Sequence, residues 1–478
     1  MASLTNIEDL AALRGVLAEL DPQGRLASLD MKRVTISERA HLQVAEALCE
    51  VLPAQTKQDP AQICLITDET PIMRDGELLL DVVMAQLAPD FRVTHKKLTA
   101  DHGGLHADEK ALDQAALAAS GADAIVTIGS GTITDIGKVA SQRNDFIPQV
   151  ALQTAASVDG FTDNVSVILK HGVKRTVPSA WPAIVLSDVV TINGAPREMN
   201  SGGFGEALSL FTAPADWYLS HVLGLDHSFH PASMAMLRAA SAEAPDWSAG
   251  LARGEREATA KLTRLLALRG LVSGVSNTTA CLSGVEHVIS HMLDLHHAAR
   301  HQPIGLHGEQ VGVASIIAAR LWRQAIDEDL LSVTNLPQPD MTKMQARVLA
   351  AFQHLDRDGK LAQECWRDCE AKLIGLQNNW QKLEDLTQNW QVRKYEFDPL
   401  VTDAETLAKA LKISGAAIKF KALRQSVDDE LALWAVQNCH LMRNRFNLVD
   451  LLDLLGLWTP ERIRFAMRDL IGGSHDET

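Results

Sequence analysis

The sequence lacks the features that mark several specialised classes of protein. Its 478 residues include six cysteines but no CxxC pair, so no disulfide framework and no cysteine-rich zinc site are indicated. No run of 18 apolar residues occurs, so we expect no membrane span. The net charge of −15 argues against a nucleic-acid surface. The first residues are acidic and amphipathic rather than basic and then apolar, so we expect no signal peptide and a cytoplasmic protein.

The composition, 46% hydrophobic and 22% charged, is that of an ordinary globular protein, and the length favours two domains. Short apolar runs alternate with helical patterns in the first part of the chain. Strands are expected at 62–69, 91–98 and 122–128, and helices at 76–88, 108–120 and 133–140. This alternation predicts an open parallel sheet with helices on both faces.

From about residue 195 onward, helical periodicity dominates and strand-like runs almost vanish. We therefore expect an α/β domain at 1–192, with a helical N-terminal extension at 1–30, and an all-α domain at 193–478. Residues 356–400 are polar and carry tryptophans, and we interpret them as a helical insertion at the surface.

Histidines are concentrated between residues 283 and 308, which hold six of the 17 in the chain. His287 and His291 are four residues apart and would share one face of a helix. His307 follows a break that contains a proline and a glycine. Two imidazoles and a carboxylate form a suitable donor set for a divalent metal. The alternative is an ordinary polar helix rim with an accidental run of histidines.

A carboxylate for such a site is available in the segment 199–217. Glycines lead into a predicted helix there, and Glu206 stands in its first turn. Glu206 could complete the set with His287 and His307, and three protein ligands leave a position open for water or substrate. The alternative is an acid that interacts with the helix dipole. Asp216, ten residues further on, is a second candidate.

A glycine turn follows the strand at 122–128. Gly129, Ser130, Gly131 and Thr132 form this turn, where backbone N–H groups and a helix N-terminus favour a phosphate. The turn does not have the GxGxxG pattern, and a turn used only for packing is the alternative.

Two other segments contain candidate ligand-binding residues. Asp68 ends the strand at 62–69, where a carboxylate accepts hydrogen bonds from an adenosine ribose and repels a 2′-phosphate, favouring NAD over NADP. A capping aspartate is the alternative. Thr154, Ser157 and Asp159 cluster among small residues, which allow a ligand to approach closely. The alternative there is a connecting turn.

Taken in order, these segments resemble the iron-containing alcohol dehydrogenase and dehydroquinate synthase superfamily, and within it the sn-glycerol-1-phosphate dehydrogenase family. The resemblance covers about residues 60–460. The stretches that carry it are GSGTITDIGK, TAASVDGF, GVKRTVPSAWPAIVLSD, SGGFGEAL with TAPADW, SGVEHVISH, LHGEQVGV and RNRFNLVDLLDLLGL. Their order and spacing, rather than any single motif, make the resemblance specific.

The resemblance implies a dinucleotide-binding N-terminal domain, a helical C-terminal domain and a metal site in the cleft between them. Glu206, His287 and His307 would bind one divalent metal, with zinc expected and nickel or iron as alternatives. His291 would stand beside the metal as a catalytic residue that orients substrate or relays a proton. Asp159 would lie near the nicotinamide and the substrate, with a role in both binding and catalysis.

The remaining implied residues bind the cofactor or the substrate. The pyrophosphate of NAD, with NADP as the alternative, would lie on the glycine turn formed by Gly129, Ser130, Gly131 and Thr132. Asp135 and Lys138 belong to the same motif, and Thr154 and Ser157 would lie along the nicotinamide ribose. Lys174 and Arg175 are candidates for binding a substrate phosphate.

The chain departs from the glycerol-1-phosphate dehydrogenase pattern at one ligand. Glu206 stands where that pattern has Asp, and Glu is the residue of the dehydroquinate synthase branch. We predict an NAD-linked, metal-dependent dehydrogenase of a small polyol phosphate, converting dihydroxyacetone phosphate and sn-glycerol 1-phosphate into one another, as a homodimer or larger homo-oligomer. The alternatives are an NAD-recycling sugar-phosphate cyclase or lyase, and a non-catalytic interaction protein.

Overall fold

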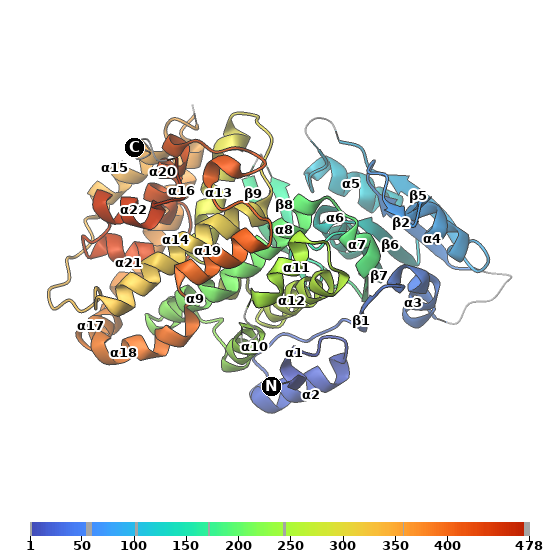
Figure 1. Ribbon diagram of the computed structural model, residues 1–478, viewed down its shortest axis with the longest axis horizontal. Helices are drawn as coiled ribbons and strands as arrows, with labels where there is room; N and C mark the ends of the chain where they lie inside the picture. The colour runs from blue at the N-terminus through green and yellow to red at the C-terminus, as the bar shows by residue number, and fades with distance from the viewer. Residues whose placement is uncertain are drawn as a thin grey trace. The chain divides into compact units, whose positions relative to one another are not determined.

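The computed structural model describes residues 2–53, 60–100, 104–170, 173–241, 245–356 and 358–472. The chain forms two compact units, and neither is continuous in sequence (Figure 1). The first unit consists of Met1–Gly203 and Ala242–Asn277, and the second of Phe204–Ser241 and Thr278–Thr478. The domain boundary expected after residue 192 assumed two continuous segments, whereas these units interleave along the chain.

The first unit contains a six-stranded sheet in which every pair of neighbouring strands is parallel. In spatial order the strands are β1 (Arg33–Ser37), β10 (Ile184–Asp188), β7 (Gln149–Gln153), β6 (Ala124–Gly129), β2 (Gln62–Thr67) and β5 (Arg92–Lys97). After β2 the chain moves outward to β5 and then returns to the other side of β2 to form β6. The carboxyl ends of β2 and β6 therefore flank the point at which the strand order reverses, where α/β sheets bind ligands.

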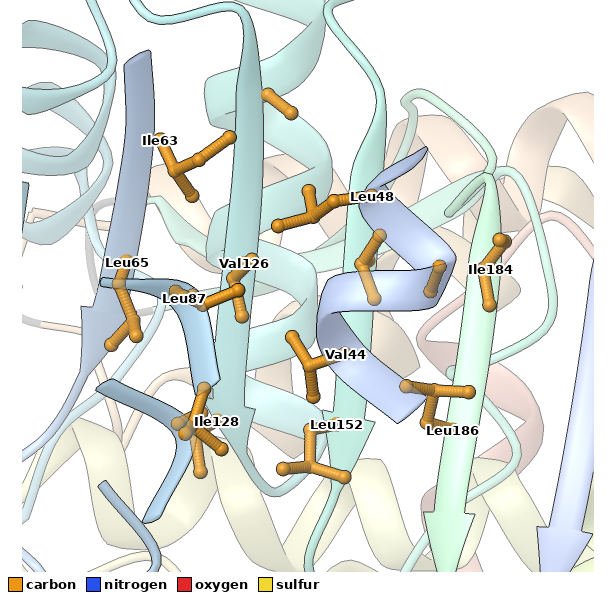
Figure 2. Close-up of a cluster of buried hydrophobic side chains, with 14 of the residues drawn as sticks. Val44, Leu48, Ile63, Leu65, Leu87, Val126, Ile128, Leu152, Ile184 and Leu186 are labelled. Atoms are coloured by element: carbon orange, nitrogen blue, oxygen red, sulfur yellow. The ribbon is translucent and has the colours of Figure 1, made fainter. Parts of the chain in front are cut away.

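Helices cover both faces of this sheet, as the alternating pattern predicted. On one face, α3 (Val44–Val51) and α4 (Leu79–Leu87) pack on alternate strand residues such as Leu65, Val126 and Ile128 (Figure 2). On the other face, α5 (Glu109–Ala118) and α6 (Gly131–Arg143) cover the intervening residues of the same strands. Because β6 is buried along its whole length, its sequence AIVTIG is almost continuously apolar.

Further elements complete the first unit. They are α1 (Ala2–Thr5), α2 (Leu10–Leu20), α7 (Val189–Asn193), α11 (Ala249–Ala252), α12 (Arg256–Val275), the hairpin of β3 (Met73–Arg74) and β4 (Glu77–Leu78), and the hairpin of β8 (Val165–Lys170) and β9 (Val173–Pro178). Helix α12 comes from the second sequence segment of this unit. Its Ala267 carbonyl accepts a hydrogen bond from Thr162 Oγ1 at 2.7 Å, which joins the loop after β7 to the helix.

The second unit is helical, and its described residues contain no strand. Its main helices are α9 (Ala213–Val222), α10 (Pro231–Ser241), α13 (Val285–Ala299), α14 (His307–Asp327), α15 (Met341–Phe352), α16 (Lys360–Asn378), α17 (Trp380–Gln388), α18 (Trp390–Phe397), α19 (Ala404–Ile413), α20 (Asp429–Asn438), α21 (Leu448–Leu454) and α22 (Pro460–Met467). Helix α14 is largely buried and packs against α13, α19 and α22. None of the helices in the described ranges is long and apolar enough to cross a membrane.

The segment 356–400 is helical as expected, and its interpretation as a surface element describes only one face of these helices, on which Val392 and Tyr395 are exposed. Trp390 is fully buried, and its indole N–H donates to the Ala325 carbonyl near the end of α14 at 3.1 Å. Leu383 and Leu386 are also fully buried. The polar residues of this segment lie between the buried ones, so the average polarity concealed an apolar face that joins the core of the second unit.

Candidate functional site

Three side chains of the second unit converge into a group that could hold a metal ion. Glu206, His287 and His307 each offer one ligand atom, and these atoms lie within 4.8 Å of one another. Glu206 Oε1 is 3.1 Å from His287 Nε2, and Glu206 Oε2 is 3.7 Å from His307 Nε2. Two imidazole nitrogens and one carboxylate are a donor set that suits zinc and other divalent first-row metals. The residues present therefore fit a resident divalent metal.

Glu206 lies at the end of its helix, not in the first turn as the sequence had suggested. Helix α8 spans Arg197–Ala207, so the glycines of SGGFGEAL are inside the helix rather than before it. Glycines occur inside this helix because other backbone segments pack closely against it. A Cβ at Gly203 would lie 1.8 Å from the Ala156 carbonyl oxygen of the first unit, so only glycine fits there.

A second close contact between backbones sets the position of Glu206. A Cβ at Gly205 would lie 2.2 Å from the Gly308 carbonyl oxygen, and a Cβ at Gly312 would lie 2.8 Å from the Gly205 Cα. The end of α8 and the first turns of α14 therefore cross with no side chain between them. Glu206 follows one of these glycines and His307 precedes another, so the crossing brings the two ligands together.

His287 is held in position by a neighbouring carboxylate. Its Nδ1 lies 2.9 Å from Glu286 Oε1, which also accepts a hydrogen bond from the Gly284 N–H at 2.7 Å, and Thr212 Oγ1 donates to Glu286 Oε2 at 3.0 Å. A proton on Nδ1 leaves Nε2 free to bind a metal, and a carboxylate partner increases the basicity of the ring. Burial lowers the pKa of His287, but Glu206 and Glu286 outweigh burial and raise this pKa to about 9. A metal must therefore displace a proton here.

His291 is adjacent to the group but is not one of its three members. Its ring centroid is 6.2 Å from that of His287 and 5.5 Å from that of His307, on which it stacks with an angle of 13° between the planes. This position is compatible with the predicted role beside the metal, which stays a prediction.

Asp216, the second carboxylate candidate, has a structural position. Its two oxygens accept hydrogen bonds from the Val285 N–H at 3.0 Å and the Leu448 N–H at 2.9 Å, which are the first residues of α13 and α21. Burial and then the charge of Glu286 raise the pKa of Asp216 to about 8. Asp216 therefore joins the starts of two helices and is not one of the three residues that could hold a metal ion.

In the first unit, several predicted cofactor-binding residues lie at the carboxyl edge of the sheet. Gly129 ends β6, and its carbonyl accepts a hydrogen bond from the Thr154 N–H at 3.1 Å. A Cβ at Gly131 would lie 2.5 Å from Val158 Cγ2, so the glycine turn and the loop containing Ser157 are side by side. Ser130 is the N-cap residue of α6, and Thr132 lies in the first turn of that helix.

Asp68 follows β2 at the same edge of the sheet. Its Oδ1 accepts a hydrogen bond from the Thr70 N–H at 2.8 Å, which is the turn-capping contact of the alternative interpretation. The two interpretations are compatible, because a carboxylate that caps a turn through one oxygen still presents charge to a ribose.

Asp135 and Lys138 form a buried ion-pair cluster. Lys138 Nζ lies 2.9 Å from Asp135 Oδ1 and 2.6 Å from Asp163 Oδ1, and it donates to the Gly160 carbonyl at 2.8 Å. Asp135 Oδ2 accepts from the Val167 N–H at 3.0 Å. These contacts connect α6 to residues 160–167, and burial, opposed by Lys138, raises the pKa of Asp163 to about 7.

The predicted substrate-binding residues are in two places. Asp159 is paired through Oδ2 with Nη2 of Arg269 at 3.1 Å, and Arg269 is fully buried on α12. Arg175 lies on β9, where its register partner is Ile168 of β8. The Lys174 side chain is outside the described residues. The sequence did not indicate Arg269, because nothing in the pattern LALRGLVSG shows that it faces a residue 110 positions earlier.

The sequence pattern of the iron-containing alcohol dehydrogenase family matches residues 42–196. The glycerol-1-phosphate dehydrogenase [NAD(P)+] of Bacillus subtilis (strain 168) is 31% identical over 262 residues, which are 54% of this chain and 64% of that protein. The enzyme of the same name from Pyrococcus furiosus is 35% identical over 214 residues, covering 44% of this chain and 59% of that protein. The crystal structure of an iron-containing alcohol dehydrogenase is similar with a TM-score of 0.52 and 13% identity, over 94% of this chain and 99% of that chain.

These similarities confirm the predicted resemblance and the predicted fold. The structural similarity, at 13% identity, supports the fold alone. The chain spans 64% and 59% of the lengths of the two dehydrogenases. We therefore treat the activity and the substrate of this chain as proposals.

Proposed function

We propose that this chain is an NAD(P)-linked, metal-dependent dehydrogenase of a small polyol phosphate. The observation that carries the proposal is the convergence of Glu206, His287 and His307, with Glu286 holding His287 in the form that can bind a metal. The names of the two related dehydrogenases support the substrate class. Within that class, we propose interconversion of dihydroxyacetone phosphate and sn-glycerol 1-phosphate.

When bound, the divalent metal supplies a Lewis acid for a substrate oxygen, and the nicotinamide supplies or accepts the hydride. The protein residues bind and orient these groups. The backbone N–H groups of the turn at 129–132 bind the pyrophosphate, and Asp68 binds the adenosine ribose. Asp159, held by Arg269, orients the substrate hydroxyl.

Two further steps are assigned to side chains of the proposed site. His291 moves the proton between the substrate oxygen and solvent, because an imidazole can accept a proton at one ring nitrogen and donate one from the other. Arg175, with Lys174, binds the substrate phosphate. Zinc as the resident metal, NAD rather than NADP, a homo-oligomer and a cytoplasmic location stay predictions.

Glu206 motivates a second candidate function. Glutamate at this place resembles the dehydroquinate synthase branch, in which NAD is recycled during a cyclisation or elimination. However, both oxygens of Glu206 approach the histidines, at 3.1 and 3.7 Å, so the longer side chain does not prevent ligation. A dehydrogenase changes the net amount of NADH during turnover, whereas a recycling cyclase does not.

The proposal is tested with the full chain, loaded with zinc or nickel, by following NADH and NADPH oxidation at 340 nm across ketose phosphates and simple ketones. We expect oxidation with dihydroxyacetone phosphate. His287→Ala should lose at least about 100-fold in kcat/KM, corresponding to about 3 kcal/mol of transition-state stabilisation. The absence of cofactor oxidation with every ketose phosphate and ketone, in a chain that binds metal stoichiometrically, would overturn the proposal.

A further inference from the structure

The second histidine of the metal-binding group makes a different contact from the first. His307 Nδ1 lies 2.9 Å from Ser290 Oγ, and the Ser290 hydroxyl donates to Gln310 Oε1 at 2.7 Å. Ser290 is fully buried on α13, and Gln310, on α14, is 1% exposed. The three groups form a hydrogen-bonded chain that is closed to water at Ser290 and Gln310.

The direction of these hydrogen bonds determines which nitrogen of His307 can bind a metal. The Ser290 hydroxyl has one proton, and when it donates that proton to Gln310 Oε1 it accepts a hydrogen bond from Nδ1–H of His307. Nε2 is then unprotonated and faces Glu206 Oε2 at 3.7 Å. In the reverse direction, Gln310 donates through its amide N–H and Ser290 donates to Nδ1, so the proton is on Nε2 and blocks ligation.

Gln310 is the group that can reverse this direction. Its amide has an acceptor and a donor end of nearly equal shape, so either end can face Ser290. In the structure Nε2 faces away, next to Gly305, where an added Cβ would lie 2.8 Å from it. Among the described residues, Nε2 has no hydrogen-bond partner, although it is buried. His287 has no such ambiguity, because its partner Glu286 is a carboxylate that only accepts when ionised.

We propose that Ser290 and Gln310 are positioning residues that select the ring nitrogen which His307 offers to the metal, and that glutamine makes this selection incomplete. The inference rests on the metal centre of the proposed function and extends it to two residues that touch neither substrate nor cofactor. It predicts that an acceptor-only side chain at position 310 supports metal binding as well as glutamine does, or better.

The test measures zinc affinity of the full chain by competition with a chromophoric chelator, together with the visible absorption of the cobalt-substituted protein. Ser290→Ala removes the acceptor for Nδ1–H and should weaken zinc binding by about 10- to 100-fold, the usual effect of losing a hydrogen-bond partner of a ligand histidine. Gln310→Leu should also weaken zinc binding. Gln310→Glu should retain affinity within about threefold of the parent or exceed it.

Ser315→Ala is the matched control. Like Ser290, Ser315 is fully buried. It lies on α14, and its hydroxyl donates to the Val311 carbonyl of the same helix at 2.8 Å. Its removal should leave zinc affinity and the cobalt spectrum unchanged. Equal losses in Ser290→Ala and Ser315→Ala would mean that any buried serine matters, and would overturn the proposal.

The remaining outcomes separate this inference from the proposed function, since zinc affinity is measured without turnover. A Ser290→Ala variant with parental affinity overturns the selection by Ser290, and a Gln310→Glu variant as weak as Gln310→Leu overturns the acceptor requirement. If zinc affinity of the parent depends on Ser290 but the parent reduces no ketose phosphate, this inference is supported and the proposed dehydrogenase activity is overturned. A parent that binds no zinc overturns both.

Discussion

At the residue scale, Asp68 has two roles, and a single substitution separates them. Its carboxylate caps a turn through the Thr70 N–H, and in the proposed function its charge repels a 2′-phosphate. Asparagine retains the Oδ1 acceptor but removes the charge. Asp68→Asn should therefore preserve the local turn and change only the electrostatics of the cofactor site.

We expect Asp68→Asn to raise the ratio of kcat/KM for NADPH over NADH by about tenfold, which corresponds to about 1.4 kcal/mol. Steady-state kinetics with both cofactors measure this ratio, and the melting temperature checks that the turn is intact. Asp68→Ala, which loses the cap as well, is the comparison. An unchanged ratio in Asp68→Asn would show that this carboxylate does not discriminate between the two cofactors.

The residues around the metal-binding group show what sequence reasoning could reach at this scale. His287, His307 and Glu206 were predicted because ligand residues have a recognisable chemistry and lie in motifs with a known order. Ser290 and Gln310 were not predicted, because a serine and a glutamine on apolar helices have no distinguishing pattern. Their role depends on distances across two helices, which only the fold determines.

At the scale of elements, helix α16 of the segment 356–400 and the helices next to it are joined by one buried and one half-buried ion pair. Arg347 on α15 contacts both oxygens of Asp453 on α21 at 2.7 Å, and His440 Nε2 lies 3.3 Å from Asp453 Oδ2. Lys372 on α16 pairs with Asp450 on α21 at 2.6 Å. Helix α21 is therefore the element to which the neighbouring helices are attached by ion pairs.

Asp453 gives a pH dependence with a definite sign. Burial raises the pKa of its carboxyl, but His440 and Arg347 outweigh burial and lower this pKa to about 2. A lowered pKa stabilises the folded state above the unfolded value of about 4, and this stabilisation is lost as the pH falls towards 2. The shift corresponds to about 2 kcal/mol at neutral pH.

Urea unfolding of the parent and of Asp453→Asn between pH 7 and pH 2 measures this contribution. The variant should be less stable by about 2 kcal/mol at pH 7, and the difference should shrink between pH 4 and pH 2. A difference that stays constant across this range would mean that Asp453 stabilises the unit by packing rather than by charge.

At the scale of the whole molecule, the chain leaves the first unit after residue 203 and returns to it at 242. The returning segment brings α12, whose Arg269 pairs with Asp159 and whose Ala267 carbonyl binds Thr162. Periodicity predicted the type of elements such as the strands at 62–69, 91–98 and 122–128, because it depends on neighbouring residues. It could not predict that a helix after residue 242 packs with the sheet, because an apolar helix face does not specify its partner.

This interleaving predicts how fragments of the chain behave. A fragment of residues 1–203 lacks α12 and should show no cooperative thermal unfolding, because it exposes the loop at 159–162 and the surface that α12 covers. Replacing 204–241 by a flexible Gly/Ser linker, so that 1–203 is joined to 242–277, should restore a cooperative transition. Circular dichroism measures both, and cooperative unfolding of 1–203 alone would contradict the prediction.

The crossing of α8 and α14 at Gly205, Gly308 and Gly312 has a consequence for descendants of this chain. A side chain at 205 would force the two helices apart and separate Glu206 from His307, although neither ligand had changed. Under the proposed function, such a descendant would lose its metal while Glu206, His287 and His307 all remain in its sequence. Such a pseudoenzyme would be recognised by what stands at the glycine positions, and a search for intact ligands alone would classify it wrongly.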